Sequence, residues 1–279
     1  MRLLLFTLAG PRASFGSSAA AGDERDSLES PSRSALLGLI AAAHGVIRSD
    51  SAALNRLRDG LAFATRLDRA GNPEIDFHTA QVAKRKDLKR RAVRVRGDEL
   101  DVRRDQLTTI LSSRTYRCDY QATVAIAATG SASEATSLNS VADALRRPKW
   151  MLYLGRKSAP LAWPMDPQII ESAAFEDAFD QYDRMCANRL ASWPSGGQVQ
   201  VPVGWTPPKR RKTHAHDRDQ FVADEAFRAI LPNGAFPAGA RMVIRRDVPI
   251  DRQRWLFANQ QRSHWERDSQ ASGKEARDE

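Results

Sequence analysis

The sequence predicts an α+β protein whose first part, residues 1 to about 160, forms a ferredoxin-like, RRM-like core. Hydrophobic patterns follow one another there as strand, helix, strand, strand, helix and strand, the order of a split βαβ unit. The chain has 279 residues and 42% hydrophobic content, so it can bury a sizeable core. Lys and Arg outnumber Asp and Glu by 43 to 34, and the net charge of +9 favours a polyanionic partner.

The core begins with a buried strand over residues 2–9, which Gly10-Pro11 is expected to end. Ser30-Pro31 then predicts the start of a helix, with a hydroxyl as the cap and proline as the first helical residue. Gly45 predicts the end of this helix. The helix is apolar on nearly every side, so it should be buried. A short helix over residues 52–59 follows.

Two middle strands are predicted at residues 61–68 and 122–128, where the pattern alternates. The first should be half-buried, and Gly71-Asn72-Pro73 should end it. Residues 82–107 lie between them as an insertion rich in cations, which we expect to project as a thumb. It is either a solvated charged loop or an RNA backbone contact, and the clustering of its cations favours RNA. These cations are Lys84, Arg85, Lys86, Lys89, Arg90, Arg91, Arg94 and Arg96.

The last helix and strand of the core follow the second middle strand. Ser131 and Glu134 form a predicted capping box. Apolar residues at helical spacing over 138–145 then predict a helix that Pro148 ends. The apolar run Trp150–Leu154 should be a strand buried on both faces.

Residues 161–269 are predicted to form a small β-rich element at the C-terminal end, and residues 270–279 a disordered tail. The pattern assigns no role to residues 220–240. The predicted parts are a helix with a buried aromatic face at 175–186, a hairpin strand at 196–201, an exposed basic loop at 205–219 and a closing strand at 241–249.

Two cysteines, Cys118 and Cys186, lie far apart and lack metal-ligand spacing, so we expect no disulfide, no metal site and no cofactor. This fits a reducing, cytoplasmic compartment. The apolar run at residues 3–9 sits at the lower length limit of a secretory signal, and Arg12 interrupts the approach to a cleavage site, so we interpret it as a strand. No segment approaches the roughly 20 apolar residues of a membrane span.

Gly155-Arg156-Lys157-Ser158 follows the last predicted strand and suits a loop that faces phosphate. Gly155 would let the backbone approach a ligand closely. Arg156 offers a planar fork, Lys157 a point charge and Ser158 an uncharged donor. The alternative is a strand-end turn whose cations are solvated, and this stretch alone slightly favours that alternative.

The sequence offers few combinations of residues that could form a catalytic site. His78 could pair with Tyr116 or Lys157 as an acid–base set for RNA cleavage, but nothing in the sequence brings these residues together. The sequence holds no Walker loop, no nucleophile elbow and no paired-histidine metal motif. We therefore expect a binding protein rather than an enzyme.

Several short motifs occur in a fixed order along the chain: Leu8-Ala9-Gly10-Pro11 with Ser14-Phe15-Gly16, Pro31-Ser32-Arg33-Ser34 running into Leu36-Leu37-Gly38-Leu39, Asp76-Phe77-His78-Thr79, Tyr116-Arg117-Cys118-Asp119, Tyr153-Leu154-Gly155-Arg156-Lys157-Ser158 and Arg245-Arg246-Asp247-Val248-Pro249. Together they resemble the CasD family, the fifth Cas subunit of the type I-E CRISPR surveillance complex, Cascade. The resemblance covers residues 1 to about 165 closely.

This resemblance implies a non-catalytic, RNA-binding RAMP subunit that works in antiviral defence. It would grip the 5′ handle of the CRISPR RNA (crRNA) and cap the CasC backbone, with CasA beside it and target DNA reached through the complex. The thumb would contact CasC and RNA, and Phe15 could stack on a base. The implied RNA-binding residues are Ser14, Phe15, Arg33, Ser34, His78, Thr79, Gln81, Arg114, Tyr116, Gly155, Arg156, Lys157 and Ser158.

Two other functions stay open. The first is an endoribonuclease that processes CRISPR precursor RNA, because the related type I-C subunit resembles this chain and cleaves such RNA itself. In type I-E systems the resemblance assigns cleavage to CasE instead. The second is a basic structural protein unrelated to CRISPR, which would explain the charge but not the ordered motifs.

Overall fold

The computed structural model describes residues 1–16, 24–84, 88, 92–130, 136–191, 218–231, 233–251 and 256–268. Its strands are β1 (Arg2–Ala13), β2 (Phe15–Gly16), β3 (Glu24–Arg25), β4 (Ser27–Leu28), β5 (Leu61–Arg69), β6 (Asn72–Ala83), β7 (Leu107–Ala128), β8 (Gln168–Glu171), β9 (Arg218–Asp224), β10 (Arg241–Asp251) and β11 (Leu256–Asp268). Its helices are α1 (Arg33–His44), α2 (Ser51–Gly60), α4 (Arg96–Leu100), η1 (Arg104–Gln106), α5 (Leu138–Arg146), α6 (Phe175–Ala191) and η3 (Glu225–Ile230).

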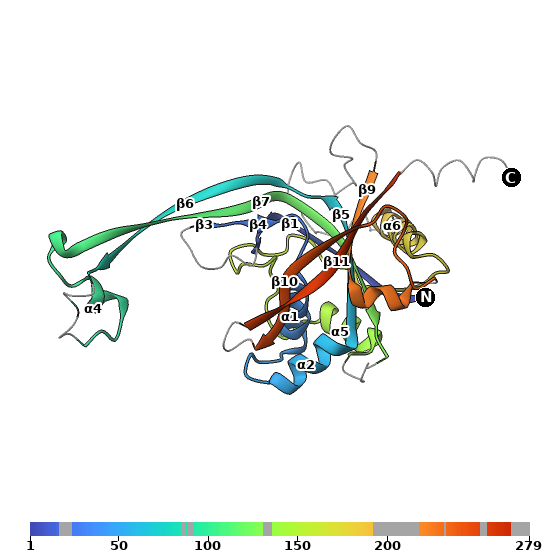
Figure 1. The fold of residues 1–279 in the computed structure, drawn as a ribbon, viewed down its shortest axis with the longest axis horizontal. Helices are drawn as coiled ribbons and strands as arrows, with labels where there is room; N and C mark the ends of the chain where they lie inside the picture. The colour runs from blue at the N-terminus through green and yellow to red at the C-terminus, as the bar shows by residue number, and fades with distance from the viewer. Residues whose placement is uncertain are drawn as a thin grey trace.

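A mixed sheet runs through the whole molecule (Figure 1), in the order β10-β11-β9-β5-β7-β1-β8. Neighbours along this path are antiparallel, while the short strand β3 pairs with β7 in parallel. The C-terminal strands β9, β10 and β11 therefore continue the sheet beyond β5. They extend a sheet built by the first 171 residues.

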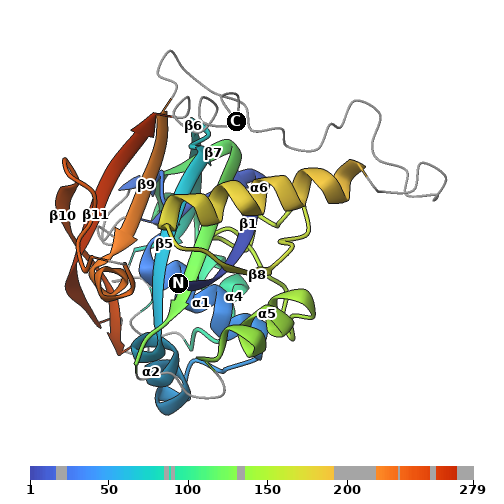
Figure 2. The same ribbon diagram turned by 90° about the vertical axis from the view of Figure 1, so that its right-hand side faces the viewer.

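Helices cover both faces of this sheet. One hydrophobic cluster joins Leu4, Phe6 and Leu8 of β1 to α1 and α5. Leu3 and Leu5, which alternate with them, join a second cluster with α6, β9 and η3. Figure 2 shows α6 crossing the sheet on the side opposite α1 and α5. Because both faces are covered, β5 is buried along nearly its whole length, and the predicted half-buried strand at 61–68 is wrong in this respect.

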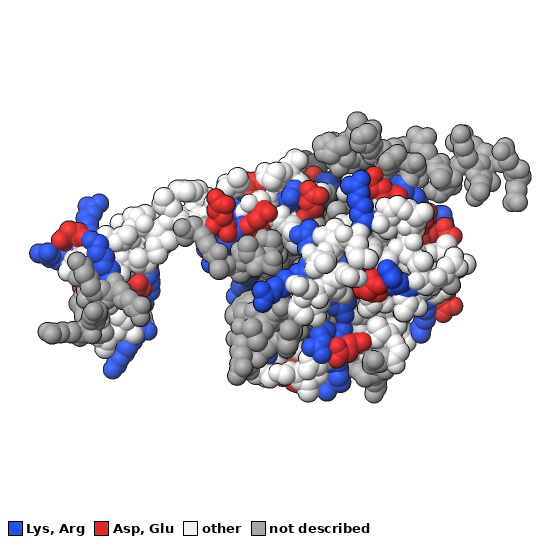
Figure 3. Space-filling model, in the orientation of Figure 1, with Lys and Arg blue, Asp and Glu red and all other residues white. Residues whose placement is uncertain are grey.

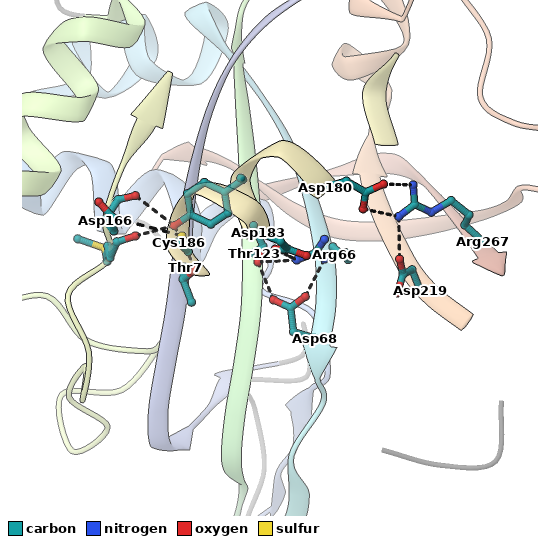
Figure 4. A network of polar contacts seen from close by, with 12 residues as sticks. Thr7, Arg66, Asp68, Thr123, Asp166, Asp180, Asp183, Cys186, Asp219 and Arg267 are labelled. Atoms are coloured by element: carbon teal, nitrogen blue, oxygen red, sulfur yellow. Dashed lines mark hydrogen bonds and ion pairs between the residues drawn. The ribbon is translucent and has the colours of Figure 1, made fainter. Parts of the chain in front are cut away.

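A polar network fastens α6 to the sheet (Figure 4). Arg66 of β5 is 1% exposed, and its guanidinium donates to Asp68 and, across the layer, to Asp183 of α6, both at 2.7 Å. Arg267 of β11 similarly donates to Asp180 of α6 at 2.8 Å and 3.1 Å. The neighbouring carboxylates raise the pKa of Arg66 despite burial, so its charge is retained inside the protein.

The buried helix α1 has the predicted end but a different start. Gly45 terminates it in the left-handed region with φ 74°, as expected for a C-terminal glycine. Its cap is Ser32, whose hydroxyl accepts from the Ala35 N–H at 3.2 Å. The predicted cap at Ser30, with Pro31 as the first helical residue, is wrong because Ser32 reaches the free N–H.

The first strand passes through its predicted turn. β1 continues over Gly10-Pro11 to Ala13. The predicted break at Gly71-Asn72-Pro73 is confirmed, because β5 ends at Arg69 and Gly71 has φ 74°, although Asn72 and Pro73 already belong to β6. On its second edge, β1 pairs with β8 only over Arg2–Leu5 among the described residues. The N–H that Pro11 lacks would therefore face no partner strand there, and the proline is tolerated.

Two predictions about α5 and the segment that follows it are also wrong. Helix α5 begins at Leu138, and the Ser137 hydroxyl accepts from the Ser140 N–H at 3.3 Å, so Ser131 is not its cap. The run Trp150–Leu154 forms no strand beyond a single bridge between Tyr153 and Pro160. Trp150 and Met151 are 45% and 66% exposed. The last strand of the predicted core is instead β8, which pairs with β1 on the edge that β7 does not occupy.

The predicted insertion forms the end of a long hairpin. β6 pairs with β7 from Asn72 and Cys118 to Ala83 and Leu107, and the hairpin projects far from the body of the molecule (Figure 1). The paired hairpin therefore starts ten residues before the predicted boundary at residue 82. It starts earlier because 12 residues of β6 pair with β7 instead of forming a loop.

Some C-terminal predictions can be compared with the structure. The aromatic face at 175–186 belongs to α6, where Phe175, Phe179 and Tyr182 are buried as predicted. The closing strand is β10, but β11 follows it and was not predicted. Residues 218–219, assigned to a basic loop, belong to β9. The hairpin strand at 196–201, the rest of the loop and the tail at 270–279 lie outside the described residues.

Candidate functional site

The base of the projecting hairpin carries a polar face. Glu74 and Asp76 of β6 lie opposite Tyr116 and Arg114 of β7 in the strand register, and alternate residues of a strand share one face. His78 belongs to the same face, with its Nε2 2.8 Å from the Asp76 carboxylate. The hairpin therefore gathers three predicted site residues, His78, Arg114 and Tyr116.

Tyr116 is 4% exposed and lies beneath this face, where two guanidinium groups flank its ring. Arg12 from β1 lies 5.5 Å from the ring centroid and Arg156 lies 5.2 Å from it. The Tyr116 hydroxyl is 3.5 Å from the Ser158 hydroxyl. The Ser158 contact lowers the pKa of Tyr116, burial opposes this, and Arg156 lowers it further. Two cations and a hydroxyl donor thus surround one tyrosine, and such groups can donate to phosphate oxygens.

The loop that brings Arg156 and Ser158 there is closed by its own backbone. The Leu154 N–H donates to the Ala159 carbonyl at 2.7 Å, and the Ala159 N–H donates to the Arg156 carbonyl at 2.9 Å. Leu154 and Ala159 are fully buried, while Lys157 and Ser158 are exposed. The loop is therefore anchored at both ends and presents its polar side chains outward.

Gly155 has a structural role that differs from the predicted one. Its φ is +85°, and a Cβ atom there would fall on the carbonyl oxygen of Ser14 and 2.7 Å from the Ser14 carbonyl carbon. The Ser14 N–H donates to the Leu154 carbonyl at 2.9 Å. Gly155 thus lets the loop pack on the end of β1, and its predicted close approach to a ligand is not what requires a glycine.

Arg12 was missed by the sequence analysis. Its guanidinium contacts the Glu74 carboxylate at 2.6 Å, and the Cys118 thiol donates to the same carboxylate at 2.6 Å. Burial, followed by the carboxylate, raises the pKa of the Cys118 thiol. Reading β1 past Pro11 would have placed Arg12 beside β7, since Arg12 pairs with Cys118 in the register.

Three residues implied by the family resemblance are buried. Ser14, Phe15 and Arg33 are 1%, 3% and 4% exposed. Phe15 packs edge-on against Tyr120 with the ring centroids 5.3 Å apart, within the cluster that holds α1. Its ring has no exposed face, so the predicted stacking of Phe15 on a base is wrong for this conformation.

Arg33 instead forms a buried ion pair with Asp224 of β9, and its guanidinium also donates to the carbonyls of Arg58 and Leu61. The Asp224 carboxylate accepts from the Phe63 N–H at 3.1 Å. Arg33 therefore joins α1 to the C-terminal strands, and its predicted RNA contact is wrong. Ser34, beside it in the first turn of α1, shares a hydrogen bond with Ser32 at 3.0 Å.

The other predicted RNA-binding residues of β6 lie on the opposite face of the hairpin. Thr79 and Gln81 are odd-numbered residues of β6, so they lie on the face opposite His78, with Ile75 and Phe77. Ile75 and Phe77 are 71% and 62% exposed. The hairpin thus has one polar face and one face with large exposed apolar side chains.

Three of the predicted thumb cations lie in the described part of the chain. Lys84 donates to the Asp105 carbonyl at 3.2 Å, and Arg96 pairs with Glu99 and donates to the Gln81 carbonyl. Arg94 is exposed. Figure 3 shows Lys and Arg side chains around the tip of the hairpin and a shaft without visible charge. Arg85, Lys86, Lys89, Arg90 and Arg91 lie outside the described residues.

The proposed acid–base pair of His78 and Tyr116 is not assembled. His78 lies opposite Ser112 and Tyr116 opposite Glu74, four residue pairs apart, or about 13 Å along the strands. Direct proton transfer requires an approach of about 3 Å. Among the described residues there is no group of three or more side chains that could hold a metal ion, and no helix there is long and apolar enough to cross a membrane.

Fold and site together define a mixed α/β protein with a cationic surface of the kind that accepts phosphate. A sequence model of the CRISPR-associated protein family Cas_Cas5 matches residues 3–259. The CRISPR system Cascade subunit CasD of Escherichia coli (strain K12) is 32% identical over 162 residues, which are 58% of this chain and 68% of that protein. The chain therefore belongs to the CRISPR-associated Cas5 family.

A solved structure, the "CRISPR RNA-guided surveillance complex", contains a chain similar to this one throughout. Its TM-score is 0.58 at 28% identity, and the match covers 95% of this chain and 89% of that chain. The match to CasD covers 162 residues, which is too short to include both β1 and the C-terminal strands. The structural match covers 95% of the chain, so the C-terminal strands have a structural counterpart.

Proposed function

We propose that this chain is a non-catalytic, RNA-binding subunit of a type I-E CRISPR surveillance complex, holding the 5′ handle of the crRNA. The observation that carries the proposal is the convergence of Arg12, Arg156 and Ser158 on Tyr116, beside the exposed Lys157. Phosphate oxygens accept from guanidinium groups in a planar fork, and single-stranded RNA is held mostly through its backbone and by stacking. Family membership supports RNA of CRISPR origin.

The proposal includes a ferredoxin-like RAMP core. The strand order β5-β7-β1-β8, with α1 and α5 packed together on one face, supports it. It also includes neighbouring Cascade subunits, a CasC backbone subunit at the thumb and CasA beside it, with target DNA reached through the complex. The exposed Ile75, Phe77, Ile110 and Leu111 of the hairpin support a protein contact there. The cytoplasmic location remains part of the proposal.

Handle binding should depend on the shape of Arg156 as well as its charge. Purified protein is expected to bind a repeat-derived handle RNA and leave it uncut, while Arg156→Lys weakens binding about tenfold, because a point charge cannot replace a bidentate fork. Fluorescence anisotropy with labelled RNA measures the affinity, and a denaturing gel measures cleavage. Arg146→Lys, on α5 with its partner Asp143 within the same helix, is the matched control.

Two outcomes would contradict parts of this proposal. Metal-free cleavage at the handle boundary that disappears in His78→Ala or Tyr116→Phe would make it an endoribonuclease. Equal affinities for the wild type and Arg156→Ala would remove the Tyr116 face from the RNA contact.

The thumb cations should act mainly through the phosphate backbone. Replacing Lys84, Lys89 and Arg94 together by glutamine is expected to flatten the salt dependence of RNA binding by about two units of slope, at roughly 0.7 for each phosphate contact with a single strand. Titrations between low and moderate salt measure this slope. Arg103→Gln is the control, because Arg103 pairs with Asp105. An unchanged slope would mean that the thumb contacts protein only.

A further inference from the structure

A cleft of about 750 Å³ lies between the C-terminal strands and the segment that precedes α1. Arg241, Val243 and Arg245 of β10 line one side, and as alternate residues of a strand they point the same way. Residues 26–30 line another side, and Arg262 and His264 of β11 contribute as well. The volume is in the range of small-ligand sites in proteins.

The cleft is lined by arginines, two of which have no ion pair with the described residues. Arg117 also lines it and pairs with Glu29 at 3.3 Å. Arg241 and Arg245 have no ion pair with any residue in the described part of the chain. Four arginines and three acidic residues, Asp26, Glu29 and Glu266, line the cleft. On the β10 side, two guanidinium groups without an ion pair to the described residues suit an anionic ligand.

Polar atoms near the cleft also lack partners. His264 Nε2 is buried, and no described residue accepts from it or donates to it. Burial, then Arg262 and Arg245, lower the pKa of His264 to about 4, so the neutral ring can offer both a donor and an acceptor. The buried Tyr120 hydroxyl has no hydrogen bond to the described residues either, and its charged neighbours include Arg262 and Arg117.

We infer that this cleft is a second RNA contact, which takes one nucleotide of a single strand with its phosphate at Arg245 and its base beside His264. Leu28, Leu67 and Val243 supply apolar surface for the base. An acidic protein segment would use the arginines but would not need an uncharged ring that both donates and accepts. The inference rests on the proposed function, because it assumes that the chain holds RNA.

The cleft is separate from the Tyr116 face. Tyr116 and Arg117 are neighbours on β7, so their side chains lie on opposite faces of the strand. Arg117 lines the cleft, whereas Tyr116 contacts Arg156. Substitutions can therefore be placed in one site without touching the other.

The test compares two neighbouring arginines of β10 in the full-length protein. Arg245→Gln is expected to weaken binding of the handle RNA about tenfold, the effect of losing one charged contact to phosphate. Arg246→Gln, the adjacent residue pointing away from the cleft, should change the affinity less than about twofold. Fluorescence anisotropy measures binding, and thermal melting of both variants checks that each is folded.

The outcomes distinguish this inference from the proposed function. Equal affinity for both variants, together with a loss in Arg156→Ala, would overturn the cleft assignment and leave the proposed function standing; the cleft would then take an acidic protein segment. A wild-type protein that binds no handle RNA would overturn both. A selective loss in Arg245→Gln supports the inference.

Discussion

Gly155→Ala is expected to cost about 3 kcal/mol or more of unfolding free energy and to lower the melting temperature by about 10 °C. Gly155 has φ +85°, which L side chains rarely adopt, and the added Cβ would fall on the backbone of Ser14. The strand end and the loop cannot both keep their places. The loss should appear in thermal or urea unfolding without any RNA present.

Gly16→Ala is the control for this experiment. Gly16 lies in β2, near Ser14 in the chain, and a Cβ there would meet no atom within 4 Å. Its expected effect is within about 0.5 kcal/mol. If Gly155→Ala melts like the wild type and loses only RNA affinity, the glycine serves a ligand, and the packing of this loop on β1 is not the reason for it.

Arg33→Met is expected to cost about 3–5 kcal/mol, because it leaves the Asp224 carboxylate buried without its charged partner. Both side chains are at most 5% exposed. Adding Asp224→Asn to Arg33→Met should recover about 2 kcal/mol, since the amide oxygen can still accept from the Phe63 N–H while the unpaired charge is gone. Urea unfolding of the two single variants and the double variant measures the coupling.

A surface pair provides the comparison for the buried one. Arg103 and Asp105 are 78% and 67% exposed, and Arg103→Met should change stability by less than about 1 kcal/mol. If Arg33→Met keeps wild-type stability and weakens RNA binding instead, Arg33 faces RNA and the ion pair with Asp224 is not formed.

Local sequence patterns predicted those elements whose signals lie within the element itself. The buried face of α1 and its Gly45 end, and the apolar spacing of α5, follow from side-chain periodicity and backbone preference. The errors arose where the pairing between strands determines the structure. Pro11 is compatible with β1 only because no neighbouring strand needs its N–H, and the run at Trp150 fails to pair because β8 occupies the edge of β1.

The candidate site was partly predictable for the same reason. Arg156, Lys157 and Ser158 share a loop whose glycine and cations are visible in the sequence, and Tyr116 meets this loop. Arg12 comes from β1, and only the register with β7 places it there. Phe15 and Arg33 were assigned by motif position, and their burial depends on contacts with Tyr120 and Asp224 far along the chain.

The most direct test of the Tyr116 face as the RNA site is photocrosslinking of a handle RNA that carries 4-thiouridine, with the attached peptides identified by mass spectrometry. The full-length protein is expected to crosslink through residues 153–160, whose Lys157 and Ser158 are exposed beside the buried Tyr116, and Arg156→Ala should lose these crosslinks. Crosslinks confined to other parts of the chain, with none in the 153–160 loop, would contradict the assignment.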